Sequence, residues 1–278
     1  MVNTRILFNE FEYHEPKTVA EAVDLLARYG KDAKILAGGT NLIVDMKLEK
    51  ISPKHLIYIG KIPELRSIAK VGSDLVVGAN VSFFDMMRAP ELKDYQILRE
   101  AFESIQLEIR RMGTIGGNIC NAASTASAAP PLLALEARVK VVSKRGSRIV
   151  PLEELFVGDR KTSLAPDELL TEIHLPALDG RCGAAYGEIK RKIKFAVVIG
   201  RQGEKCRYCR IAMGGDIEKP RRVKEAESLL EGRSFDDNAV NAACEAAVAG
   251  IDPEEWYLRE IAKYLFQKVV QEAWQRAR

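Results

Sequence analysis

The sequence predicts an α+β fold made of two domains, with the boundary near residue 177. Its 278 residues are enough for two domains, and 47% of them are hydrophobic, which is enough for a substantial core. Up to residue 176 short strand-like runs alternate with helical segments, whereas beyond it two or three strands are followed only by helices. We therefore expect a first domain over 1–176, with subdomains of about 1–60 and 61–176, and a second domain over 177–278.

The first domain opens with a helix signal. Thr18 and Glu21 form a capping box, in which the hydroxyl and the carboxylate each satisfy a free backbone N–H, and Gly30 suits the helix end. Apolar residues recur at helical spacing between these positions, so we expect a helix over 18–29. The next expected elements are a buried strand at 34–37, strands at 56–59, 66–71 and 75–79, a short helix at 82–88 and a longer helix at about 94–111.

The rest of the chain is interpreted by the same rules. Arg145 and Gly146 predict a hairpin turn, and Pro176 closes a strand. The pattern changes after this proline, where a small three-stranded sheet with helices is expected. The expected elements are a helix at 130–137, strands at 138–143, 147–150, 169–175, 184–192, 195–203 and 206–214, and helices at 222–231, 236–249 and 254–277.

Composition limits the function classes. Basic residues number 42 and acidic residues 39, and this near balance argues against a nucleic-acid binder, which usually has a concentrated basic surface. Five cysteines, an odd number without a dense framework, suggest reduced thiols. The N-terminus lacks an apolar signal core, and no stretch approaches the roughly 20 apolar residues that span a bilayer. We expect a cytoplasmic protein without a transmembrane segment.

The main functional signal is a pair of glycine segments, at 37–41 (AGGTN) and 114–118 (TIGGN). Glycines let a backbone approach a ligand closely, and successive exposed N–H groups form an anion site suited to a pyrophosphate. Neighbouring hydroxyl and amide side chains add donors. A single Gly-Gly segment is more often a tight turn, but two with such neighbours favour a site. Neither segment fits the dinucleotide fingerprint G-x-G-x-x-G or the phosphate-binding P-loop.

These residues resemble a known family. KILAGGTNLIVDMK (34–47) and IRRMGTIGGNICNAASTASAAPPLLALEARV (109–139) are similar to the FAD-binding subunit of the molybdenum hydroxylases, which include xanthine dehydrogenase, aerobic carbon monoxide dehydrogenase and nicotinate dehydrogenase. The resemblance continues through 166–176, 185–192, 210–215, 225–232 and 256–273, and so covers almost the whole chain. It implies a two-subdomain FAD-binding domain of the vanillyl-alcohol-oxidase (PCMH) type, followed by a C-terminal domain like that of the carbon monoxide dehydrogenase flavoprotein.

The resemblance also implies a set of FAD contacts. Backbone groups of 36–42 are expected to hold the pyrophosphate, and the segment around 114–124 to line the rest of the path. No catalytic side chain and no metal ligand is expected on this chain, because the flavin carries the redox chemistry. The expected cofactor-binding residues are Lys34, Leu36, Ala37, Gly38, Gly39, Thr40, Asn41, Leu42, Thr114, Ile115, Gly116, Gly117, Asn118, Asn121, Ala122, Ser124, Ser127, Leu170, Tyr186 and Lys190.

The chain departs from the family pattern at three positions. Ser127 stands where the family often has Asp, and Ser124 where it often has Pro. Ser127 can still hydrogen-bond a hydroxyl, but as a neutral group with a shorter reach. Glu188 stands where a family lysine is expected near the flavin ring. We expect FAD to bind, less tightly than is usual in the family.

The resemblance further implies partner subunits. A large subunit with molybdopterin would oxidise the substrate, and electrons would pass through two 2Fe-2S clusters on a small subunit to FAD on this chain. An external acceptor, such as NAD⁺ or a quinone, would then take them. A dimer of heterotrimers is expected. The alternatives are a stand-alone FAD-dependent oxidoreductase and a flavin-free scaffold subunit of the same fold.

Other candidate groups carry weaker signals. Cys206-x-x-Cys209 could be half of a metal site or a redox pair, but no second such pair exists, so two packed thiols are the favoured interpretation. His14, His55 and His174 are far apart in the sequence, and each is expected to be a surface or packed side chain rather than a ligand.

Overall fold

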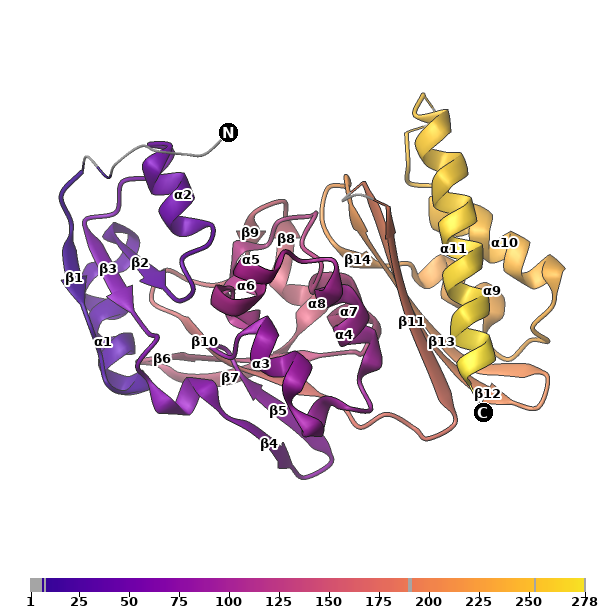
Figure 1. The fold of residues 1–278 in the computed structure, drawn as a ribbon, viewed down its shortest axis with the longest axis horizontal. Coiled ribbons are helices and arrows are strands. Elements are labelled where there is room, and N and C mark those ends of the chain that lie inside the picture. The colour runs from indigo at the N-terminus through magenta and orange to yellow at the C-terminus, as the bar shows by residue number, and fades with distance from the viewer. Residues whose placement is uncertain (1–6, 8, 190–191, 253, 278) are drawn as a thin grey trace.

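The computed structural model describes residues 7, 9–189, 192–252 and 254–277. Three sheets lie side by side along the long axis of the molecule (Figure 1). The sheets have the strand orders β1-β3-β2, β4-β5-β10-β6-β7 and β11-β12-β13-β14, and a two-stranded β8-β9 ribbon accompanies the central sheet. The predicted α+β class is confirmed.

The N-terminal sheet is parallel and carries the first glycine segment. It consists of β1 (Glu12–His14), β3 (His55–Tyr58) and β2 (Ala33–Leu36), and α1 (Val19–Tyr29) packs on it. The Thr18 hydroxyl accepts from the N–H of Glu21 at 3.1 Å, as the capping box predicts. The chain leaves β2 through 37–41 and enters α2 (Leu42–Lys47), a six-residue helix that the sequence analysis did not identify.

The central sheet is antiparallel and is built around β10 (Leu169–Leu175). This strand pairs with β5 (Asp74–Gly78) on one side and β6 (Arg138–Ser143) on the other. Short helices cover one face of the sheet (Figure 1). The other elements of this region are β4 (Ile68–Val71), β7 (Gly146–Pro151), β8 (Phe156–Gly158), β9 (Lys161–Thr162), α3 (Phe83–Arg88), α4 (Gln96–Glu103), α5 (Leu107–Met112), α6 (Ile115–Asn121), α7 (Ala129–Ala134) and α8 (Leu152–Leu155).

The prediction of a single helix over about 94–111 is wrong. The chain instead forms α4 and α5, and the break lies at 104–106. The hydroxyl of Ser104 donates to the carbonyl of Ala101 at 2.8 Å, which ends α4, and Gln106 is extended with ψ of 144°. Serine favours helix ends because its side chain competes for backbone groups.

The C-terminal region is an antiparallel sheet with helices on one face. It has four strands rather than the expected three, because the two-residue β14 (Arg221–Arg222) pairs with β13. Its other elements are β11 (Cys182–Ile189), β12 (Ile193–Gln202), β13 (Lys205–Gly215), α9 (Lys224–Leu230), α10 (Asp237–Val248) and α11 (Trp256–Arg276).

Strand β12 is buried on both faces. Ala196 and Val198 belong to the core of the central region, whereas Phe195 and Val197 pack in the core that the C-terminal helices cover. Alternate residues of a strand point to opposite faces, so this strand joins the two cores. The C-terminal sheet is therefore docked through an apolar face rather than tethered by a linker.

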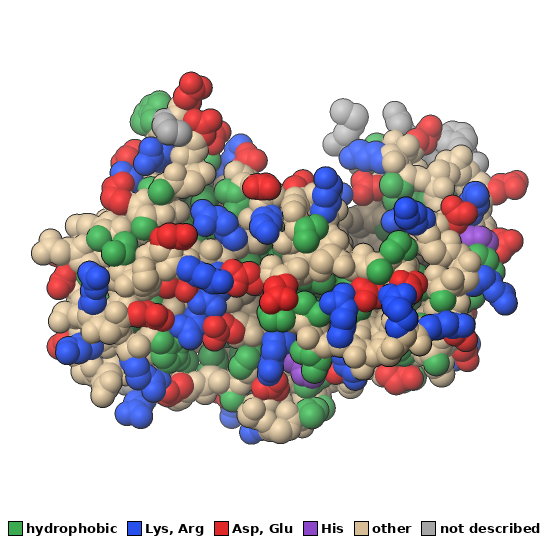
Figure 2. All heavy atoms as spheres, turned by 180° about the vertical axis from the view of Figure 1, so that it is seen from behind, with side chains coloured by type: hydrophobic (Ala, Val, Ile, Leu, Met, Phe, Trp, Pro, Cys, Tyr) green, Lys and Arg blue, Asp and Glu red, His purple; other side chains and the backbone are tan. Residues whose placement is uncertain are grey.

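The surface and the helices give two further observations. Figure 2 shows Lys and Arg side chains interspersed with Asp and Glu on the face opposite to that of Figure 1. In the described part of the chain, every helix is either too short or too polar to cross a bilayer.

Candidate functional site

A cavity of about 440 Å³ lies where the two glycine segments meet. This volume is within the usual range of small-molecule sites. Its lining includes Lys34, Ile35, Ala37, Gly38, Gly39, Thr40, Asn41, Leu42, Asp45, Ile59, Phe83, Ile109, Thr114, Gly116, Gly117, Asn118, Asn121, Arg160, Leu164, Glu168, Leu169 and Leu170. The structure thus brings together 13 of the 20 expected cofactor-binding residues around one space.

The two segments touch each other. A Cβ atom built on Gly38 would lie 1.8 Å from the carbonyl oxygen of Met112, which lies two residues before the second segment. A Cβ atom on Gly117 would lie 3.9 Å from the Cβ of Ala37. The close backbone approach at Gly38 explains why a residue without a side chain is required there.

The first segment presents free backbone donors. Within the described residues, the N–H groups of Gly38, Gly39, Thr40 and Asn41 have no hydrogen-bond acceptor. Gly39 has φ of +71°, a conformation that favours glycine and that turns the chain between β2 and α2. Successive unpaired N–H groups at the wall of a cavity form an anion-binding site.

The second segment does not present its amides, which corrects the expectation for it. Its residues form the start of α6, with Thr114 as the N-cap. The N–H of Ile115 donates to Val81 O at 3.0 Å, and that of Gly116 to Ala79 O at 2.8 Å. The N–H groups of the next two residues are also used: Gly117 donates to Thr114 Oγ1 at 3.1 Å, and Asn118 to Thr114 O at 3.0 Å.

The second segment and the rest of α6 contribute side chains to the cavity. Asn118 and Asn121, both on α6, line it. The side-chain oxygen of Asn118 is buried and has no hydrogen-bond partner among the described residues. A buried polar atom without a partner costs about 1–3 kcal/mol, so its position on a cavity wall is one that a bound hydroxyl or amide would satisfy. This observation fits a polar ligand such as the ribityl or ribose part of FAD.

Several lining residues were not found from the sequence. Arg160 comes from the β8–β9 turn, and its Nη1 lies 3.3 Å from Asp45 Oδ2 of α2, so an ion pair joins two residues of the cavity lining. Phe83, Leu164 and Glu168 contribute apolar and acidic surface. Hydrogen bonds from Arg148 at 2.9 and 3.1 Å lower the pKa of Glu168 against the opposing effect of burial. No local motif marks these positions, because only the tertiary fold brings them to the cavity.

Six expected residues lie outside the lining of this cavity. Ile115 and Ala122 are buried in the core, and Leu36 packs against the Gly39 backbone. The N–H of Ser124 donates to Asp159 Oδ1 at 2.8 Å. The other two are Ser127 and Tyr186, and Lys190 lies outside the described residues. FAD contacts of all 20 expected residues remain predictions, and these seven lack the support of a place in the cavity lining.

Ser127 and Tyr186 belong to a polar cluster between the central and C-terminal regions. Lys194, fully buried on β12, places its Nζ 2.6 Å from Glu188 Oε2 and 3.1 Å from Ser127 Oγ. The Tyr186 hydroxyl donates to the same Glu188 oxygen at 2.6 Å, and Ser104 Oγ lies 3.1 Å from Ser127 Oγ. Glu188, a departure from the family pattern, is thus the acceptor at the centre of this cluster.

Burial and hydrogen bonding shift the pKa of Glu188 in opposite directions. Burial raises its pKa, but the hydrogen bonds from Lys194 and Tyr186 outweigh it and lower the pKa below its ordinary value. Burial and the neighbouring Glu188 carboxylate raise the pKa of the Tyr186 phenol far above its usual value. At neutral pH the cluster therefore holds Glu188 as a carboxylate and Tyr186 as a neutral phenol.

The two cysteines of the C-x-x-C pair are buried on β13. Cys206 and Cys209 lie in the core under the C-terminal helices, and burial raises the pKa of the Cys209 thiol. A buried thiol with a raised pKa is a poor nucleophile and a poor ligand.

Comparisons with known proteins agree over the whole length. The family described as "FAD binding domain in molybdopterin dehydrogenase" matches residues 9–178, and that described as "CO dehydrogenase flavoprotein C-terminal domain" matches residues 192–273. The carbon monoxide dehydrogenase medium chain of Hydrogenophaga pseudoflava is 36% identical over 280 residues, which cover 96% of this chain and 98% of that relative. The xanthine dehydrogenase FAD-binding subunit of Escherichia coli O157:H7 is 31% identical, over 96% of this chain and 97% of that relative.

A solved structure shows the same architecture. One chain of carbon monoxide dehydrogenase from Hydrogenophaga pseudoflava, in a form that lacks the Mo-pyranopterin moiety of the molybdenum cofactor, superposes with a TM-score of 0.93 at 35% identity. The match covers 100% of both chains.

Proposed function

Because the chain belongs to the family of FAD-binding subunits of molybdopterin dehydrogenases, and is thus an FAD-carrying component of an oxidoreductase, we propose that it relays electrons from 2Fe-2S clusters on a partner subunit to an external acceptor. One observation carries the cofactor-binding part of this proposal: four consecutive residues with free N–H groups line a cavity at the junction of the two glycine segments.

This chain's own residues would act by holding the cofactor. The N–H groups of 38–41 would donate to the diphosphate, and Arg160 of the cavity lining would add positive charge. Asn118 and Asn121 would hydrogen-bond the polar parts of the ligand that lie beyond the diphosphate. When bound, FAD supplies reversible acceptance of one or two electrons; the protein supplies position and exclusion of water.

We also propose the partners. Relatives are named medium chains or FAD-binding subunits of carbon monoxide and xanthine dehydrogenases, which implies a molybdopterin-binding large subunit and a 2Fe-2S small subunit. A dimer of such heterotrimers remains our prediction for the assembly. Lys34, Leu36, Ile115, Ala122, Ser124, Ser127, Leu170, Tyr186 and Lys190 complete the proposed FAD environment.

The test is a binding comparison between FAD and FMN on the purified chain. FMN has no diphosphate, so FAD should bind far more tightly if the free amides of 38–41 are used. The chromophore released from the purified protein should be FAD. A colourless protein that ignores added FAD, or equal affinity for FMN, would contradict the binding mode.

A matched pair of variants sharpens this test. Gly39→Val should abolish FAD binding, because a branched side chain would be forced into a positive-φ position beside the ligand. Gly72 also has positive φ, at +61°, but lies in the β4–β5 turn with open space around it. Gly72→Val therefore imposes similar backbone strain and should retain FAD. Coexpression with the two proposed subunits should yield a complex that reduces an added acceptor, and a chain that never copurifies with them would overturn the proposed assembly.

A further inference from the structure

A cluster of three potential metal ligands lies in the N-terminal sheet. Glu12 and His14 are two residues apart on β1, so their side chains share one face of the strand, and Glu12 lies directly opposite His55 in the β1–β3 register. The sheet thus brings together two histidines that are 41 residues apart, although each was expected to be a surface or packed side chain rather than a ligand. None of the three lines the cavity at the glycine segments.

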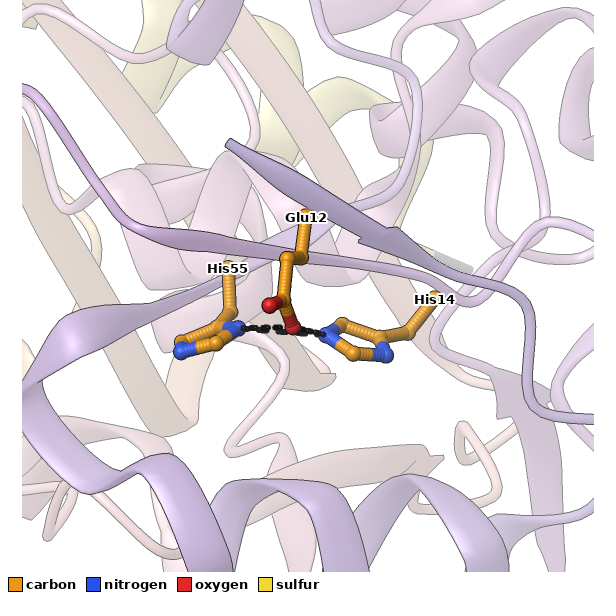
Figure 3. A group of neighbouring side chains, drawn as sticks. All are labelled: Glu12, His14 and His55. Carbon is orange, nitrogen blue, oxygen red and sulfur yellow. Dashed lines mark hydrogen bonds and ion pairs between the residues drawn. The ribbon is translucent and has the colours of Figure 1, made fainter. Parts of the chain in front are cut away.

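The three side chains present their ligand atoms to one point. Figure 3 shows the Glu12 carboxylate between the rings of His55 and His14, with one oxygen facing a nitrogen of each ring. Glu12 Oε2 lies 3.2 Å from His55 Nδ1 and 3.7 Å from His14 Nε2. The two ring nitrogens are 3.2 Å apart.

These distances match a metal site in size. A triangle with these sides has a circumscribed radius of about 2.0 Å, so one point lies about 2.0–2.1 Å from all three atoms, which is the length of Zn²⁺ bonds to imidazole nitrogen and carboxylate oxygen. At a bond length of about 2.1 Å, that point lies about 0.7 Å from the plane of the three atoms, which is close to the one third of a bond length expected for three ligands of a tetrahedral ion. A fourth position is left for water.

The surroundings hold the two rings in place. The ring of Tyr29, at the end of α1, stacks on His55 with centroids 3.7 Å apart and on His14 with centroids 5.1 Å apart. The histidine side chains are 15% and 19% exposed, whereas that of Glu12 is 68% exposed. Two ordered imidazoles and one accessible carboxylate form a partly preorganised site that an ion can enter from solvent.

We propose that Glu12, His14 and His55 form a binding site for a divalent transition-metal ion, with Zn²⁺ as the best match. Two imidazoles and one carboxylate suit Zn²⁺ and its close neighbours, whereas Mg²⁺ and Ca²⁺ prefer oxygen ligands alone. The ion would link the three-residue edge strand β1 to β3. Strand β3 also pairs with β2, which is followed by the first glycine segment.

The same geometry has a competing explanation. One imidazole could donate to the other and to the carboxylate, which gives a hydrogen-bonded trio with no affinity for metal. The two explanations differ in a measurable way, because only a metal site saturates at one ion per chain and gives a tetrahedral ligand-field spectrum.

The experiment uses the full chain with any affinity tag removed and its flavin content recorded. Co²⁺ is titrated and followed by its visible absorption, and Zn²⁺ is then added in competition; Mg²⁺ is a negative control. We expect one Co²⁺ per chain with a tetrahedral spectrum, displaced by Zn²⁺, and a higher thermal midpoint in Zn²⁺, because a ligand that binds only the folded state stabilises it. Flavin content should not change, so this result is independent of the proposed function.

Variants assign the ligands. His14→Gln and His55→Gln should each weaken Co²⁺ binding by at least about tenfold. His174→Gln is the matched control, since His174 lies on β10 and pairs with Glu172 at 2.9 Å. Glu12→Gln, at a mostly exposed position, keeps the test decisive if a histidine variant fails to fold. Absence of saturable Co²⁺ binding, or equal loss in His174→Gln, overturns the proposal.

Discussion

Replacing Gly38 with alanine should push the two glycine segments apart and so disrupt the cavity wall that they form. The new Cβ would lie 1.8 Å from the carbonyl oxygen of Met112 and 2.7 Å from its carbonyl carbon. Both atoms belong to the backbone, so no side-chain rotation can relieve the clash. Since Cβ contacts below 3.0 Å are essentially never seen, the segments must move apart by at least 1.2 Å, the difference between 3.0 and 1.8 Å.

This displacement sets the expected loss of affinity. A hydrogen bond of about 2.9 Å lengthened by that amount exceeds the limit of about 3.2 Å and is lost. Each hydrogen bond to a charged group contributes about 1.5–3 kcal/mol. Loss of two such bonds from the 38–41 amides to a diphosphate would cost about 3–6 kcal/mol, or roughly 140- to 20,000-fold in Kd.

The assay is FAD titration of the deflavinated protein, followed by flavin fluorescence. Gly180→Ala is the matched control, because a Cβ at Gly180 has open space around it and the position does not have positive φ. The thermal midpoint of the flavin-free form separates local effects from unfolding, since overpacking alone costs about 1–3 kcal/mol of stability. A folded Gly38→Ala protein with unchanged FAD affinity would refute the idea that contact between the segments shapes the site.

Two further predictions concern α6 and the polar cluster. Thr114→Ala removes the N-cap of α6 and should lower the free energy of unfolding by about 1 kcal/mol, measured by urea denaturation, whereas Thr114→Ser should restore it. Lys194→Met leaves the Glu188 carboxylate without its buried cation and should cost about 3–5 kcal/mol, part of which Glu188→Gln in the same chain should recover. Because the folded-state pKa of Glu188 is lowered, its stabilising effect is present above the ordinary carboxyl pKa and is lost as the pH falls through the lowered value. Denaturation midpoints should therefore drop more steeply in acid for the natural protein than for Glu188→Gln; parallel curves would contradict this assignment.

The elements that were predicted correctly are those whose signals are local. The helix over 18–29 appears as Val19–Tyr29 because its cap at Thr18 and its stop at Gly30 lie within the segment itself. The strands at 195–203 and 206–214 appear as β12 and β13, since long apolar runs beside a polar turn have few other solutions. Six-residue α2 escaped prediction because so short a helix has little periodicity and is stabilised by tertiary packing.

In the candidate site, too, the features with local signals could be predicted and those that depend on the tertiary fold could not. The two glycine segments and their convergence could be predicted because their composition is unusual and the family resemblance is specific. Arg160 and Asp45 could not, because their ion pair joins a β-turn to a helix 115 residues away in the sequence. The pairing of His14 with His55 depends on a parallel register, which no local pattern encodes.

The two glycine segments look equivalent in the sequence but have different roles in the structure. The N–H groups of the second segment donate to the segment that follows β5 and to the cap of α6, and the bonds to Ala79 O and Val81 O fix α6 beside the central sheet. That anchoring makes Met112 O a fixed surface against which Gly38 rests, and so it positions the segment whose N–H groups remain free. Anion binding therefore falls on 37–41, while 114–118 acts as its rigid support and supplies side chains. It follows that a substitution that disturbs the backbone of the second segment weakens ligand binding mainly by moving the first, whereas loss of the Asn118 side chain acts on the ligand directly.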